Sequence, residues 1–169
     1  MTRKLDFVPV LLGLAGLIPL LATGLAAVSA GYDQSPAVML ALIGYGALVL
    51  SFLGGVHWGL ALADGAARDT AIEHPPADTA TERKRFALGV LPALVGWIAM
   101  LVALVTQPVL SLAVLIAAFI ATLVAEAQAA RHGLVPAHYM GLRWVLSVIV
   151  IAVLTTVLVL RLLGAHIVL

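Results

Sequence analysis

Long apolar runs, separated by short groups of charged residues, dominate the pattern along this chain. Apart from Asp33, no Asp, Glu, Lys or Arg lies between Asp6 and Asp64, and none lies between 86 and 125. About 20 apolar residues form a helix that crosses roughly 30 Å of hydrocarbon, so each run is long enough to span a membrane. The expected spans are about 7–30, 36–63, 86–106, 108–126 and 139–163.

These spans are expected to be helices. Lipid cannot hydrogen-bond an open backbone, and the runs are continuous, without the alternation of barrel strands. We predict an all-α membrane protein, a single domain over 1–169 built as a bundle of about five transmembrane helices. The longest connection, 64–85, is polar and contains Pro75-Pro76, which indicates a mobile surface loop.

The placement of Lys and Arg predicts the orientation. In a five-span arrangement eight of the nine cations lie on one side, and only Arg161 lies on the other. The eight are Arg3, Lys4, Arg68, Arg83, Lys84, Arg85, Arg131 and Arg143. Cytoplasmic segments are the cation-rich ones, so we expect the N-terminus in the cytoplasm and the C-terminus outside.

A signal peptide is the alternative for the first span. Arg3-Lys4, the apolar stretch and the sequence Val28-Ser29-Ala30 resemble its three parts. The apolar run is longer than the roughly 7–15 residues of a usual signal peptide, and we therefore favour a retained span.

Composition supports the membrane assignment and excludes several functions. Apolar residues make up 63% of the chain and charged residues 10%, against roughly 45–50% and 25% in soluble domains. The net charge of +1 argues against a nucleic-acid partner. Cysteine is absent, which excludes disulfides, thiolate metal sites and thiol catalysis.

Small residues recur every four positions along the second span. Such a ladder lets two helices approach closely in lipid, either inside one bundle or between two copies of the chain. We expect packing inside the bundle. The ladder consists of Ala47, Ser51, Gly55, Gly59 and Ala63.

His57 is the ionisable residue within that span. Ionisable groups inside a membrane are costly and often functional. The alternative is a neutral histidine that only hydrogen-bonds its neighbours near headgroup depth. At 100° per residue, His57 points about 160° away from Gly55, so it should not lie on the face of the ladder.

Glu126 ends the fourth span and Arg143 begins the fifth, on the same predicted side as His57. An ion pair between them would reduce the cost of each charge. A pocket between the second, fourth and fifth spans could then bind a polar head or pass protons. The alternative is ordinary anchoring at the interface by Trp, Tyr and Arg. The candidate binding residues are His57, Trp58, Glu126, Tyr139 and Arg143.

We predict no cofactor, metal or catalytic residue. Bis-histidine haem ligation needs paired histidines, whereas His57 has no second histidine within a span. No metal-spacing motif, phosphate loop or serine elbow occurs.

Several motifs resemble the DUF3429 family of transmembrane protein 69-like proteins. The most specific is Ser-Phe-Leu-Gly-Gly-Val-His-Trp-Gly at 51–59, and weaker ones lie at 9–19, 91–97 and 136–143. The resemblance implies a small multi-span protein of bacterial inner membranes or mitochondria, with no assigned reaction. The resemblance also implies an acidic residue, usually Asp, near position 126, from which the Glu126 of this chain is a conservative departure.

Two functions compete on this evidence. The leading hypothesis is an accessory subunit or assembly factor of a larger membrane complex, because the chain is compact and has no catalytic motif. The alternative is a binder or carrier of a small membrane-soluble molecule, such as a quinone, a lipid or a proton, through a cytoplasmic-side pocket. The expected partners are therefore the lipid bilayer, other membrane subunits, or a quinone or lipid. An enzyme is less favoured because no nucleophile or metal motif is found.

Overall fold

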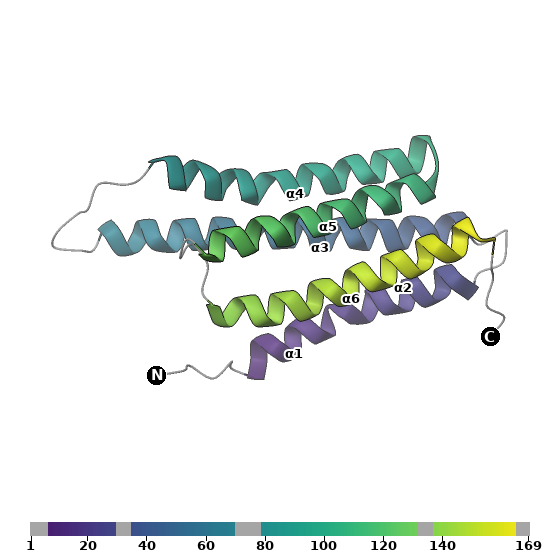
Figure 1. The fold of residues 1–169 in the computed structure, drawn as a ribbon, viewed down its shortest axis with the longest axis horizontal. Coiled ribbons are helices and arrows are strands. Elements are labelled where there is room, and N and C mark those ends of the chain that lie inside the picture. The colour runs from purple at the N-terminus through teal and green to yellow at the C-terminus, as the bar shows by residue number, and fades with distance from the viewer. Residues whose placement is uncertain (1–6, 30–34, 70–78, 132–136, 165–169) are drawn as a thin grey trace.

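The structure is a computed structural model that describes residues 7–29, 35–69, 79–131 and 137–164. The described part of the chain folds into six α-helices (Figure 1). They are α1 (Phe7–Ala15), α2 (Leu17–Ser29), α3 (Ser35–Asp69), α4 (Thr79–Val105), α5 (Pro108–Arg131) and α6 (Ala137–Leu162).

Five apolar spans follow from these helices, because α1 and α2 together form one bent span along the lower edge of Figure 1. The spans are Val10–Ser29, Pro36–Ala63, Phe86–Val105, Pro108–Arg131 and Met140–Leu162. The all-α, five-span prediction is thus confirmed. The predicted orientation of the termini across the membrane stays a prediction.

The helix α3 lies at the centre of the bundle and packs against α2, α4 and α5, while α6 packs against α5, α2 and α1. The main apolar core fills the space between α2, α3, α4, α5 and α6, and a smaller cluster forms around Ala129 and Met140. The fully buried members of the main core include Leu20, Leu42, Leu50, Leu115, Phe119 and Leu154. Large apolar side chains such as Phe52 and Val105 remain exposed on the outside of the bundle, where lipid is the solvent.

Two glycines give α3 and α4 their closest approach. A Cβ atom at Gly54 would overlap the backbone carbonyl of Gly89, and one at Gly89 would overlap the indole of Trp58. About two helical turns after Gly89 on α4, Gly96 packs against Ala47 of α3. A Cβ atom added at Gly96 would lie 3.1 Å from the Ala47 carbonyl oxygen. Close backbone packing of this kind holds helices together in lipid.

The polar connection between the second and third spans is helical at both ends. The helix α3 continues to Asp69 and α4 begins at Thr79, whereas the sequence suggested a loop over 64–85. The residues after Ala63 contain no proline before Pro75, so nothing stops the helix where the apolar run ends.

The first span is broken at Gly16. Its N–H still bonds the Leu12 carbonyl at 3.0 Å, but α2 restarts at Leu17 with Pro19 in its first turn. Proline has no N–H and its ring crowds the carbonyl four residues earlier, which is that of Ala15. The helix therefore changes direction just before the proline.

Candidate functional site

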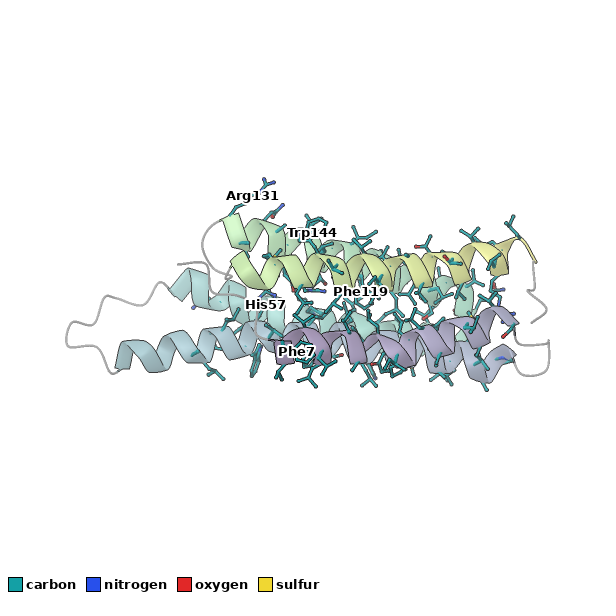
Figure 2. All side chains as sticks on the ribbon, turned by 90° about the horizontal axis from the view of Figure 1, so that it is seen from below. Phe7, His57, Phe119, Arg131 and Trp144 are labelled. Atoms are coloured by element: carbon teal, nitrogen blue, oxygen red, sulfur yellow. The ribbon has the colours of Figure 1, made fainter. Side chains whose placement is uncertain are left out.

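The side chain of His57 points into the bundle. It lies on α3 and is only 2% exposed, and Figure 2 shows it between the helices, whereas Trp144 lies on the outer side. The Nε2 atom of His57 lies 3.1 Å from Oε1 of Glu126. In the neutral ring this contact requires the Nε2–H tautomer, which donates to the carboxylate.

Glu126, on α5, is fully buried, and both of its oxygens accept hydrogen bonds. Arg143 on α6 donates from Nε to Oε2 at 2.6 Å and from Nη2 to Oε1 at 3.3 Å. This is the two-point fork that makes arginine–carboxylate pairs strong and directional. The oxygen Oε1 thus receives both His57 and Arg143.

Ser147 completes the group one turn after Arg143, whose Nη1 donates to the serine hydroxyl. A spacing of four residues places both side chains on one face of α6. Ser147 and Arg143 are 1% and 3% exposed. We call His57, Glu126, Arg143 and Ser147 the polar cluster; it joins three helices that are distant in sequence.

The polar cluster is electrically balanced when His57 is neutral, because the Arg143 and Glu126 charges cancel. Isolated charges in a bilayer cost several kcal/mol, while a paired and fully hydrogen-bonded set costs much less. The balance explains how three ionisable side chains can be buried together in a chain with so few charges.

The cluster lies toward one end of the bundle. His57 comes six residues before Ala63, the last residue of its span, and six residues of helix measure about 9 Å. This is the end at which α1 begins and α5 ends (Figure 1), the predicted cytoplasmic side. The cluster therefore lies within the apolar spans, near the end that would face the membrane interface.

A pocket of about 350 Å³ adjoins the polar cluster. Ligand pockets commonly measure about 300–1,000 Å³. Arg143 and Ser147 form its polar part. The other lining residues are mostly apolar and come from α1, α2, α3, α5 and α6: Leu12, Gly13, Gly16, Leu17, Leu20, Tyr45, Leu48, Val49, Phe52, Leu53, Phe119, Leu146 and Val150.

The pocket has an apolar rim at the surface that would face lipid. Leu12 on α1 and Leu48 and Phe52 on α3 line it, and these side chains are 66%, 66% and 73% exposed. The rim thus lies between the first span and α3, so a molecule dissolved in the bilayer could enter sideways.

The break at Gly16 helps to form this pocket. The hydroxyl of Tyr45 donates to the Gly16 carbonyl at 2.6 Å, so the break is tied to α3 by a side chain. Beyond this tie, α1 packs on α6. The first span therefore leaves space beside α3 that a straight helix packed along it would fill.

Three of the five candidate binding residues, His57, Glu126 and Arg143, come together in the cluster. Trp58 does not: it is 43% exposed, donates to the Phe86 carbonyl at 3.3 Å and packs edge-on against the Phe86 ring at 5.4 Å. The side chain of Tyr139 lies outside the described residues. Ser147 was missed, although its spacing from Arg143 was visible in the sequence.

The small-residue ladder divides between two environments. Ala47 is buried against Gly96, and Ser51 bonds the Ala47 carbonyl of its own helix at 2.8 Å. In contrast, Cβ atoms added at Gly55 and Gly59 would meet nothing within 4 Å, and Ala63 is exposed. Within one chain, α3 approaches α4 most closely at Gly54, which precedes Gly55 in sequence and is not one of the ladder residues.

Metal binding finds no support in the cluster. Within the described ranges, no group of three His, Cys, Asp or Glu side chains could hold an ion. Besides His57, the side chain that contacts the Glu126 carboxylate is the Arg143 guanidinium. A guanidinium has no acceptor atom and cannot coordinate a cation.

Comparison with known proteins agrees with the motifs. The family model described as "Protein of unknown function (DUF3429)" matches residues 6–159. Transmembrane protein 69 of Xenopus tropicalis is 39% identical over 90 residues, which cover 53% of this chain and 31% of the frog protein. The aligned part is thus less than a third of that relative. No solved structure matches. With nearly its whole length matched by the family model, this chain belongs to the DUF3429 family.

Proposed function

We propose that this membrane protein binds a small membrane-soluble molecule in the pocket between α1, α2, α3, α5 and α6. The observation that carries the proposal is an apolar pocket of about 350 Å³ that reaches buried Arg143 and Ser147 at its inner side. Apolar walls with a few placed polar groups are typical of ligand sites. The hydrogen bonds of the polar cluster, whose charges balance, hold Arg143 and Ser147 in place at this end of the pocket.

We place the pocket on the cytoplasmic side of a bacterial inner membrane. The support is the cation-rich end of the chain, where Arg83 and Arg131 lie in the sequence. The rim formed by Leu48 and Phe52 favours entry from the bilayer. Because binding in a pocket with a lateral rim needs no alternating access, binding or delivery within one leaflet fits better than transport across the membrane.

An accessory subunit is the second candidate, and one observation favours it. Gly55 and Gly59 lie on an exposed face of α3 with open space above them. A helix of another chain could pack there as closely as α4 packs on Gly54.

Native mass spectrometry of protein gently extracted from its own membrane tests both candidates. Binding predicts a small molecule of defined mass retained by the lone chain. Val49→Trp should remove it, because Val49 lines the pocket. The matched control is Val105→Trp, at an 80% exposed site outside the pocket. A protein partner at fixed ratio, lost in Gly55→Leu and kept in Val49→Trp, would favour the accessory subunit instead.

A further inference from the structure

We infer that the pocket selects an uncharged molecule with a carbonyl-type hydrogen-bond acceptor and an apolar tail, as in quinones and neutral ester lipids. The inference rests on the proposed binding function and adds the chemistry of the ligand. It follows from the unused donors of Arg143 and Ser147 and from the charge of the cluster.

Arg143 has hydrogen-bond donors to spare. A guanidinium carries five N–H groups, and contacts with Glu126 and Ser147 use one each on Nε, Nη1 and Nη2. Among the described residues, one N–H on each terminal nitrogen therefore has no acceptor. The side chain is 3% exposed and lines the pocket, so these donors are shielded from water. A buried donor without an acceptor is costly.

Ser147 supplies a further donor at the same place. Its oxygen accepts from Arg143, and no acceptor for its own hydroxyl hydrogen occurs in the described part of the chain. The hydroxyl of Tyr45, elsewhere on the pocket wall, already donates to Gly16. The polar end thus offers donors, and a matching ligand presents an acceptor.

The charge of the cluster decides the class of acceptor. Arg143 contributes +1 and Glu126 −1, which sum to zero with neutral His57. A carboxylate or phosphate head would leave a net negative charge buried among the apolar spans, which is costly. A cationic head would lie against N–H donors, which offer it no acceptor atom. An uncharged carbonyl oxygen meets the donors and leaves the balance unchanged.

Three probes of equal chain length test this inference: methyl undecyl ketone, tridecanoate and tridecane. Each is incorporated at increasing mole fraction into nanodiscs that hold the full-length protein, at mildly alkaline pH. Native mass spectrometry then gives the mole fraction at half occupancy. We expect the ketone to bind about tenfold better than the alkane, which corresponds to about 1.4 kcal/mol, and better than tridecanoate.

Ser147→Ala should weaken ketone binding and leave tridecane binding unchanged, because it removes a donor and little volume. Ser51→Ala is the matched control, since Ser51 bonds its own helix and does not line the pocket. Equal binding of ketone and alkane, or strongest binding of tridecanoate, would overturn the ligand class and leave the pocket standing. Failure of every probe, or binding unaffected by Val49→Trp, would overturn the proposed function itself.

Discussion

Glu126 and Arg143 are joined by two hydrogen bonds, of 2.6 and 3.3 Å, between side chains that are 0% and 3% exposed. They lie on successive antiparallel spans and form the centre of the polar cluster. A charge buried this deeply depends on its partner, so each residue is expected to tolerate loss of the other poorly.

Glu126→Gln should reduce the free energy of unfolding by about 3–5 kcal/mol, because it leaves the Arg143 charge buried and unpaired. Titration with a denaturing detergent measures the change. The double variant Glu126→Leu with Arg143→Met removes both charges and should recover most of the loss. A double variant as unstable as the single one would show that the cost does not come from the unpaired charge.

His57→Leu should cost less, about 1.5–3 kcal/mol, since it removes one hydrogen bond to a charged group and leaves the Glu126–Arg143 pair intact. The same titration checks it, with Trp58→Phe as a control at the neighbouring, more exposed position. A loss equal to that of Glu126→Gln would mean that His57 carries a charge on which the balance of the cluster depends.

Gly54→Ala should destabilise the protein by about 1–3 kcal/mol, the range found for overpacked interiors, because the added methyl group overlaps the Gly89 backbone. Gly55→Ala is the matched control. Its methyl group meets nothing within 4 Å, and alanine favours the helix by up to about 1 kcal/mol. Equal loss in both variants, measured as thermal stability in micelles, would contradict the glycine contact between α3 and α4.

Tyr45→Phe should cost about 0.6 kcal/mol, the average for a hydrogen bond between membrane helices, because it frees the Gly16 carbonyl. Trp97→Phe, at a 61% exposed site, controls for the loss of a polar atom from an aromatic side chain. Hydrogen exchange around residues 12–20 should rise in Tyr45→Phe alone. Unchanged exchange there would show that the bond does not hold the break in place.

The orientation can be tested directly because the chain has no cysteine. In sealed vesicles of known orientation, Arg83→Cys should react with an impermeant thiol reagent from the cytoplasmic side. Gln107→Cys, in the α4–α5 turn, should react from the opposite side. The reverse pattern would invert the predicted topology and place the polar cluster near the outer face.

The sequence predicted the spans well, because charge-free runs leave few alternatives to a membrane helix. It also suggested Glu126 beside Arg143, since five antiparallel spans bring the end of one to the start of the next. It could not distinguish Gly54 from Gly55 as the contact with α4, because the choice depends on how α3 rotates about its axis. The sequence suggested a pocket between the second, fourth and fifth spans, but it could not show that the first span forms much of the wall, because this depends on the direction that the chain takes at Gly16.

We expect the break at Gly16 also to make the protein sensitive to the thickness of its membrane. Spans adapt to hydrophobic mismatch mainly by tilting, and a continuous helix tilts as a whole. Here α1 can tilt separately from α2, because Pro19 has already removed the backbone hydrogen bond that a bend at this point would break. The rim at Leu12 moves with α1, so a thinner bilayer would change the width of the entrance while the polar cluster, held by α3, α5 and α6, stays fixed.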